Sequence, residues 1–364
     1  MHVAINAAFW NRPNTGSGQY TRQLVYHLNR LVTDLRITLI YPQVAGQPEP
    51  EAVPPSVQVK RVPVHPGNLG KVWFEQRLFP RACRDVGAPV AHVPLVVTVH
   101  DLTTLLVPEY RRPFRARLYN ALVSASARGA SRIITDSEAS KQDIITHLHI
   151  PADKIERIYL AASAQFSRQD SGLMEMAVLR KYDLPDFYVL YLGGYELHKN
   201  VMTLLLAWTY VGQALGEDYP LVLAGRRPTQ ASDNYPDYDW YIEQLRIGEY
   251  VRWIGYVDEE DKPVLYRNAE TFVFRSRQEG FGLGVLEAMA SGTPVVTTNA
   301  SSLPEVVGDA GFTVDPDDAR GMAGAIISTI IQDNLRAELR QKGEQQAANF
   351  SWEKTATETL LVYD

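Results

Sequence analysis

Short apolar runs alternate along the chain with longer amphipathic stretches, and this pattern is the first indication of its architecture. The apolar runs are four to eight residues long, rich in Val, Ile, Leu and Tyr, and lack a strict apolar–polar alternation. Such runs are typical of strands buried on both faces of a parallel sheet. The runs predicted as strands are HVAINAAF, RITLIYP, LVVTVHD, RIITDS, KIERIYL, YVLYLGG, PLVLAG, VRWIGYV, TFVFRS and PVVTT.

The alternation of strand and helix occurs twice, which predicts two doubly wound α/β domains. A chain of 364 residues is also longer than a single hydrophobic core usually supports. The small and polar segment AASAQFSRQDSG, residues 161–172, is the expected boundary. We therefore predict a first domain over residues 1–165, a second over 166–348, and a terminal helix over 349–364 that crosses back to the first domain.

One junction does not fit the alternation. The run PVAHV stands almost directly before LVVTVHD, whereas parallel neighbours need a crossover of about a dozen residues. Either PVAHV is not a full strand, or a loop is absent from the sequence near residues 93–96. We favour the absent loop.

Charge is divided unevenly between the two predicted domains. Residues 1–165 carry 19 Lys and Arg against 12 Asp and Glu, a balance of +7; the remaining residues carry 17 against 30, a balance of −13. This asymmetry favours an anionic partner for the first domain. Arginines stand beside apolar residues in stretches 71–84 and 109–123. They predict either peripheral contact with an anionic membrane or ordinary core-packed helices with solvated arginines.

Composition excludes several other classes. The one cysteine, Cys83, permits no internal disulfide framework or cysteine metal cluster, and fits a reducing, cytoplasmic location. No apolar run approaches the roughly 18 residues of a membrane helix, and the N-terminus does not have the pattern of a signal peptide. No cluster of His or Asp in the sequence suggests a metal site.

The stretch RSRQEGFGLGVLEAMASGTPVVTTN, residues 275–299, places a glycine-rich turn between two acids, Glu279 and Glu287. The turn follows a predicted strand and precedes a predicted helix, and ligands of doubly wound sheets bind beyond the carboxyl ends of the strands. The unpaired amides and positive dipole of a helix start suit a phosphate. A carboxylate accepts two hydrogen bonds from a vicinal diol. The pattern therefore predicts a site for a phosphate flanked by two polyols, as in a sugar nucleotide.

The same stretch resembles the signature of the retaining glycosyltransferases of family 4, which have the GT-B fold and carry two glutamates separated by seven residues. Four further segments resemble that family in the same order: NTGSGQYTRQL, VVTVHDL, YLGGYELHKN and LPEVVGDAGFTVDPDD. The five segments span residues 14 to 318, so the resemblance covers nearly the whole chain. It implies two Rossmann-like domains that face each other across a cleft.

The resemblance also implies roles for individual residues. Glu279 would bind hydroxyls of the donor sugar, Lys199 would neutralise the diphosphate, and His100 would contact the transferred sugar near the reacting carbon; these three are the predicted catalytic residues. The predicted donor-binding residues are Gly16, Gly18, Gly194, Arg226, Phe281, Gly282, Leu283 and Glu287.

This chain departs from the family pattern at two positions. Many members have an arginine where this chain has Gly194, so the second cation for the diphosphate must come from elsewhere, and Arg226 is our candidate. Many members also have a proline where this chain has Gly284. The glycine there is expected to loosen the start of the helix without removing the site.

The implied activity is transfer of a hexose, with retention of configuration, from a nucleotide-diphosphate sugar to a glycan or lipid-linked glycan. Segments TVHDL and LPEVVGDAG look most like bacterial mannosyltransferases of surface polysaccharide synthesis, which favours GDP-mannose and leaves UDP-glucose open. An NAD-dependent oxidoreductase is disfavoured because no G-x-G-x-x-G follows the first strand. A non-enzymatic subunit that keeps the fold is disfavoured because the predicted site residues are intact. The resemblance implies that neither a metal nor a cofactor is needed, and no nucleic-acid partner is expected.

Overall fold

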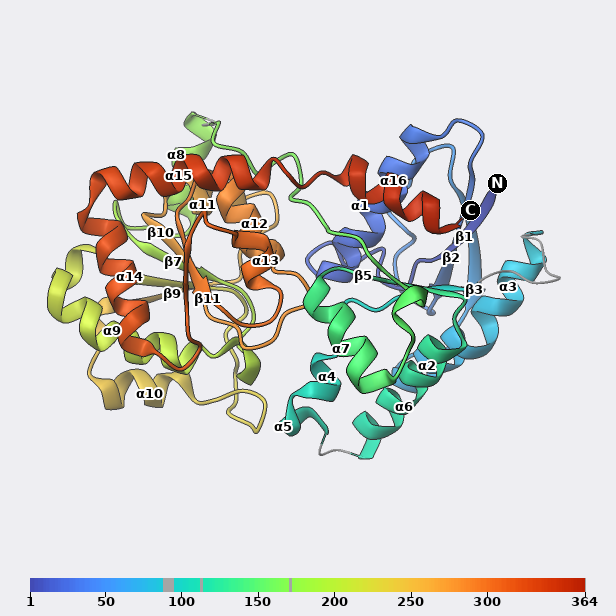
Figure 1. Ribbon diagram of the computed structural model, residues 1–364, viewed down its shortest axis with the longest axis horizontal. Coiled ribbons are helices and arrows are strands. Elements are labelled where there is room, and N and C mark those ends of the chain that lie inside the picture. The colour runs from blue at the N-terminus through green and yellow to red at the C-terminus, as the bar shows by residue number, and fades with distance from the viewer. Residues whose placement is uncertain (88–94, 112–113, 170–171, 364) are drawn as a thin grey trace. The chain divides into compact units, whose positions relative to one another are not determined.

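The computed structural model describes residues 1–87, 95–111, 114–169 and 172–363. Its named strands form three sheets, and every strand pairing described within them is parallel. Helices lie between successive strands along most of the chain (Figure 1). The predicted class, α/β with doubly wound, Rossmann-like parallel sheets, is confirmed.

Residue contacts divide the chain into two compact units. The first comprises Met1–Val97, Ala130–Arg132 and Trp352–Asp364, and the second comprises Thr98–Gly129 and Ile133–Ser351. The domain boundaries predicted after residues 165 and 348 stay a prediction.

The first unit contains a three-stranded sheet in the order β1-β2-β3. Its elements are β1 (His2–Asn6), α1 (Gly16–Leu31), β2 (Arg36–Gln43), β3 (Gln58–Pro63), α2 (Asn68–Trp73), the π-helix η1 (Phe74–Leu78), α3 (Phe79–Asp85) and α16 (Trp352–Tyr363). Helix α1 begins where the Thr15 hydroxyl accepts a hydrogen bond from the Gly18 amide at 3.2 Å, which satisfies an amide of its first turn. Helix α16 packs against α1, and His27 lies 3.3 Å from Glu353.

A second sheet has the order β4-β5-β6. The elements of this part of the chain are β4 (Val96–Thr98), α4 (Thr103–Leu106), α5 (Pro108–Arg111), α6 (Phe114–Gly129), β5 (Arg132–Thr135), α7 (Glu138–Leu148), the 3-10 helix η2 (Ala152–Lys154) and β6 (Ile155–Arg157). Helix α7 is capped by Ser137, whose hydroxyl accepts from the Ser140 amide at 3.0 Å. Both Ser137 and the neighbouring Asp136 therefore have fixed positions beyond the carboxyl end of β5.

The third sheet has six strands in the order β12-β11-β10-β7-β8-β9. Its strands are β7 (Val189–Leu192), β8 (Leu221–Ala224), β9 (Val251–Gly255), β10 (Thr271–Phe274), β11 (Val295–Thr298) and β12 (Phe312–Val314). Strands β8, β10 and β11 are wholly buried, as expected for a sheet covered on both faces. Read from β9, the order is that of a doubly wound sheet, with its switch point between β7 and β10.

The helices of the third sheet follow its strands in turn. They are α8 (Leu173–Lys181), η3 (Leu197–Lys199), α9 (Val201–Leu215), η4 (Gly216–Asp218), α10 (Tyr238–Leu245), η5 (Gly248–Tyr250), α11 (Lys262–Asn268), α12 (Leu283–Ala290), α13 (Leu303–Val307), α14 (Ala319–Ile331) and α15 (Asp333–Ala347). Helix α14 packs on α9, and α15 packs on α12. Helices α12 and α14 also contact strands β10 and β11 and so cover this part of the sheet.

All ten predicted strands are present, but β3 and β12 were not predicted. Both are edge strands. Four of the six residues of β3 are exposed, and no residue of β12 is fully buried, so neither shows the apolar run of a central strand. The PVAHV run lies within residues 88–94, outside the described residues, and strand β4 begins at Val96.

Candidate active site at the switch point

Two turns from distant parts of the sequence meet beyond the carboxyl ends of β7 and β10. Lys199, at the end of η3, lies with its Nζ 2.5 Å from the Oε1 of Glu279. The two side chains are only 17% and 13% exposed, so this is a largely desolvated ion pair. The structure thus brings together two of the predicted catalytic residues at the place where doubly wound sheets bind ligands.

Hydroxyl groups fix Glu279 on both sides. The Ser276 hydroxyl donates to its carboxylate. The Ser301 and Ser302 hydroxyls donate to its carbonyl oxygen at 2.7 and 3.1 Å, and its amide donates to Ser301. These serines were not predicted from the sequence, although Ser276 ends a predicted strand and is a polar residue at the ligand-binding edge. These hydrogen bonds hold both the carboxylate and the backbone of Glu279 in place.

The glycine turn leads into α12 as predicted. Gly282 has φ +112°, and a Cβ at this position would lie 2.8 Å from the side chain of Leu303, so a glycine is required. Phe281 is 3% exposed and packs against Tyr159 and Phe350. Its ring therefore anchors the turn in the core. The backbone amides that start α12 at Leu283 remain the part of this segment suited to a phosphate.

Glu287, on α12, is buried at 5% exposure, and the Tyr266 hydroxyl donates to its carboxylate at 3.2 Å. Burial raises the pKa of Glu287 to about 7, and Glu259 adds to this, whereas Lys262 and the Tyr266 hydrogen bond lower the pKa. The predicted ribose ligand is thus a carboxyl group that titrates near neutral pH. Tyr266, an unpredicted residue, orients it.

We predict that Glu287→Ala raises the KM for the donor roughly tenfold or more and changes kcat little, because hydrogen bonds to the ribose are equal in the ground and transition states.

The raised pKa means that Glu287 is ionised only above about pH 7. Donor affinity of the wild type should therefore weaken as the pH falls through 7. Steady-state kinetics from pH 6 to 8 measure both effects. Glu260→Ala, at an exposed position, is the control, and an unchanged KM in Glu287→Ala contradicts the assignment.

His100 follows β4 and lies against the glycine turn. A Cβ at Gly280 would lie 2.6 Å from the carbonyl oxygen of His100. The Ser140 hydroxyl lies 3.1 Å from that oxygen and 3.3 Å from the carbonyl oxygen of Gly280. The His100 Nδ1 lies 2.6 Å from the Oδ2 of Asp136, which is 2% exposed. The structure therefore joins His100 to the segment that carries Glu279.

A second histidine in this region was also not predicted. His198 precedes Lys199, and its Nδ1 lies 2.7 Å from the Tyr110 hydroxyl. Burial and the charge of Lys199 lower the pKa of His198 to about 4. This imidazole is therefore neutral near pH 7.

The remaining predicted donor residues are placed as follows. Gly194 follows β7, and a Cβ there would meet only the flexible Glu196 carboxylate, at 2.1 Å. Arg226 is exposed and lies over the Tyr256 ring at 5.8 Å. Gly225, which precedes it, approaches Gly193 so closely that a Cβ would lie 2.1 Å from the Gly193 carbonyl oxygen. The loop of Arg226 is thus adjacent to the turn after β7.

Gly16 and Gly18 belong to the first unit, at the start of α1. A Cβ at Gly18 would lie 2.0 Å from the carbonyl oxygen of Arg12, whereas one at Gly16 would meet nothing within 4 Å. Gly18 therefore has a packing reason to be a glycine, and a role of either glycine in donor binding stays a prediction.

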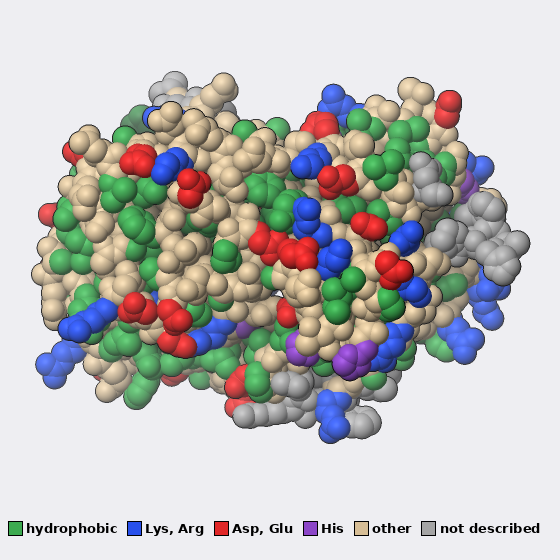
Figure 2. Space-filling model, viewed as in Figure 1, with side chains coloured by type: hydrophobic (Ala, Val, Ile, Leu, Met, Phe, Trp, Pro, Cys, Tyr) green, Lys and Arg blue, Asp and Glu red, His purple; other side chains and the backbone are tan. Residues whose placement is uncertain are grey.

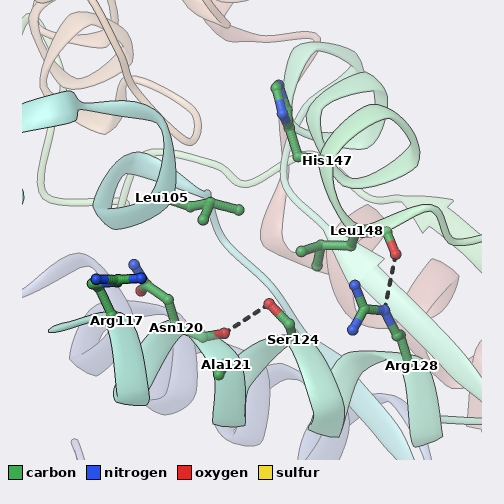
Figure 3. A pocket seen from close by; sticks show the side chains of 8 residues that line it. All are labelled: Leu105, Arg117, Asn120, Ala121, Ser124, Arg128, His147 and Leu148. Carbon is green, nitrogen blue, oxygen red and sulfur yellow. Dashed lines mark hydrogen bonds between the residues drawn. The ribbon is translucent and has the colours of Figure 1, made fainter. Parts of the chain in front are cut away.

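A cavity of about 420 Å³ lies among α4, α6 and α7, apart from these residues (Figure 3). Figure 3 shows Arg117, Ser124 and Arg128 along α6, with His147 on α7. None of the predicted site residues lines it. Among the described residues, no carboxylate forms an ion pair with either arginine.

Within the described part of the chain, no cluster of three or more His, Cys, Asp or Glu side chains is arranged to hold a metal ion. No helix formed by these residues is both long and apolar enough to span a bilayer.

The doubly wound sheet, with a lysine–glutamate pair and a glycine-opened helix at its switch point, has the arrangement expected of a glycosyltransferase with the GT-B fold. Residues 14–165 match the family described as Glycosyltransferase Family 4, and residues 180–346 match Glycosyl transferases group 1. The chain belongs to these glycosyltransferases and is an enzyme of this class.

Two relatives and one solved structure illustrate the similarity. The chain is 38% identical over 270 residues to O-antigen chain mannosyltransferase B of Escherichia coli, a match that covers 74% of this chain and 69% of the relative. It is 30% identical over 284 residues to the serotype-specific mannosyltransferase WbdA of Escherichia coli, covering 74% of this chain and 34% of WbdA. Sucrose-phosphate synthase from Thermosynechococcus elongatus has the same fold, with a TM-score of 0.79, 21% identity and coverage of 100% and 98% of the two chains.

Proposed function

We propose that the chain is a retaining mannosyltransferase that uses GDP-mannose as its donor. The observation that carries this proposal is the Lys199–Glu279 pair at the switch point between β7 and β10. The lysine suits the donor diphosphate, and the fixed glutamate suits the hydroxyls of a sugar. The preference for mannose rests on the two Escherichia coli relatives, which are named as mannosyltransferases.

The chemistry follows from these positions. Cleavage of the sugar–diphosphate bond builds negative charge on the leaving group, which Lys199 and the first amides of α12 stabilise. The sugar becomes oxocarbenium-like, and the acceptor attacks the face from which the diphosphate departs. The departing phosphate takes the proton of the acceptor hydroxyl, so the acceptor needs no separate protein base.

The first part of the test measures the unfolding temperature of the protein with GDP, UDP, ADP or NAD added. The second part is a transfer assay with the mannose and glucose derivatives of the nucleotide that stabilises the protein most. A ligand at 100 times its Kd stabilises the fold by about 2.7 kcal/mol. We expect GDP to give the largest shift, and NMR of the product to show an anomeric configuration equal to that of the donor. Stabilisation by NAD alone, or an inverted product, contradicts the proposal.

We also propose that the acceptor is a glycan or lipid-linked glycan presented at the inner, cytoplasmic face of an anionic membrane. In the helical segment α2–η1–α3, Trp73 is 57% exposed, and Arg77, Arg81 and Arg84 are exposed. Figure 2 shows Lys and Arg side chains gathered where Figure 1 places α3. An exposed tryptophan beside arginines suits a lipid headgroup layer.

The second basic stretch, 109–123, is described only in part. The side chains of Arg111, Arg112 and Arg115 lie outside the described residues, whereas Arg117 is exposed and lines the cavity in Figure 3. With Arg128, it offers cationic groups to an anionic glycan. This supports an anionic acceptor without identifying it.

For the membrane contact we predict that Arg81→Gln with Arg84→Gln weakens binding to vesicles that contain phosphatidylglycerol about thirtyfold. Each basic residue near such a surface contributes about 1 kcal/mol. Co-sedimentation at low and high salt measures this, with vesicles of phosphatidylcholine alone for comparison. Arg180→Gln with Arg252→Gln, two exposed arginines of the second unit, is the matched control. Equal binding by both double variants means that the α3 arginines are only solvated, and the acceptor should then be sought among soluble glycans.

A further inference from the structure

The contact between His100 and Asp136 joins residues that are 36 positions apart in the sequence. Strands β4 and β5 are neighbours in a sheet, and the pairing continues beyond β4 because the Val99 amide donates to the Ile134 carbonyl at 2.8 Å. His100 and Asp136 each stand just after the end of their strand. The topology therefore places an imidazole and a carboxylate side by side at one edge.

Apart from His100, few described groups can stabilise the negative charge of the Asp136 carboxylate. Asp136 is 2% exposed, and its Oδ1 is buried without a hydrogen-bond partner among the described residues. Its Oδ2 accepts from His100 Nδ1 at 2.6 Å. A buried carboxylate with one described partner is costly unless that partner is cationic. The pair is thus arranged to keep a proton on Nδ1 of His100.

The charges around His100 favour its protonated form. Burial by itself lowers the pKa of His100, but the charge and hydrogen bond of Asp136, with Asp101 adding to them, outweigh burial and raise the pKa. Asp136 lies on the turn before α7, and Asp101 directly follows His100 in the chain. The glycine turn contacts His100 through its backbone near Gly280. The side chain of His100 keeps 29% exposure, so its ring is still accessible from outside.

A diphosphate carries more negative charge than one lysine neutralises, and Gly194, in the turn that leads to Lys199, has no side chain. Lys199 is paired with Glu279, and Arg226 is exposed and lies over Tyr256. His198, the nearer histidine in sequence, has its pKa lowered to about 4 and is neutral. The backbone of His100 lies against the turn that carries Glu279, with its carbonyl oxygen next to Gly280, so an imidazolium at this position would add positive charge to the predicted donor site.

We infer that Asp136 is a positioning residue that fixes the Nδ1 proton of His100, presents Nε2 to the donor, and maintains a second cation at the donor diphosphate. This inference rests on the proposed function for the identity of the donor. The geometry of the pair does not depend on it. Asp136 itself touches no substrate and acts only through His100.

The first test is an NMR titration of the histidine rings, assigned with His100→Gln. In the wild type His100 should remain protonated at a higher pH than an unperturbed histidine. In Asp136→Asn the titration midpoint of His100 should move to lower pH. The titration midpoint of His198, which is the internal control, should stay unchanged. Asp136→Glu should restore part of the shift. An unchanged His100 midpoint in Asp136→Asn overturns the inference, and this readout is independent of any transferase activity.

The second test is the pH dependence of mannose transfer. Because the pKa of His100 is raised, its cation is present below that pKa and is lost as the pH rises through it. The kcat of the wild type should therefore have an alkaline limb, and in Asp136→Asn that limb should move to lower pH. We expect kcat at pH 7 to fall about tenfold with little change in donor KM. If Asp136→Asn does not fold, the pH profile of kcat is measured for His100→Gln instead. An alkaline limb that persists in His100→Gln overturns the inference.

The two tests also separate this inference from the proposed function. If no nucleotide sugar supports transfer, but the His100 midpoint still depends on Asp136, the proposed function fails and the pairing stands. If transfer occurs and neither readout responds to Asp136, the inference fails and the proposed function stands.

Discussion

Lys199→Ala should lower kcat for mannose transfer on the order of 10²-fold or more, while the donor KM changes much less. The departing diphosphate gains charge in the transition state, and a cation in a desolvated site stabilises that charge more than the ground state. A loss of 10²-fold corresponds to about 2.7 kcal/mol of transition-state stabilisation. Lys199 is only 17% exposed, so water substitutes poorly for its ammonium group.

Steady-state kinetics measure this effect, and thermal unfolding of the variant confirms that it is folded. Arg226→Ala is the matched comparison, because it removes an exposed cation from the neighbouring loop. Lys199→Ala with activity within a few-fold of the wild type would mean that another group neutralises the diphosphate, and an impaired Arg226→Ala would identify it.

Glu279→Ala should depress turnover by a similar factor, on the order of 10²-fold, and should affect donor binding less than turnover. The carboxylate holds Lys199 at 2.5 Å and is itself fixed by Ser276, so its loss frees the lysine and removes a ligand for the sugar hydroxyls. Glu279→Gln keeps the size of the side chain but not its charge. It should be nearly as slow as Glu279→Ala if the ion pair is what matters.

A double-mutant cycle sharpens this prediction. Lys199 and Glu279 act as one unit, so the double alanine variant should be about as slow as the slower single variant and not slower by the product of the two effects. Glu243→Ala, at an exposed position on α10, is the control. Strictly multiplicative losses would show that the residues act independently, and wild-type turnover in Glu279→Ala would remove it from the site.

The fold class and the chemical segments were predictable because their signals are local. Buried strands show as short apolar runs, and a glycine with φ of +112° at Gly282 reflects backbone geometry that few other residues adopt. Strand β3 was missed because most of its residues are exposed and several are polar, and β12 because it has only three residues. The pattern also predicts that the ligand edge lies where β10 ends.

The sequence by itself thus determined the α/β class, the positions of the turns and the residues that carry charge. Only the tertiary structure decided which of them meet: Lys199 and Glu279 across 80 positions, and His100 and Asp136 across 36. It also decided that Glu287 is buried, which raises its pKa to about 7, and that Tyr266 donates a hydrogen bond to its carboxylate. The reason is physical: strand order and burial set these distances and desolvation energies, and both arise from the packing of segments that are remote in the chain.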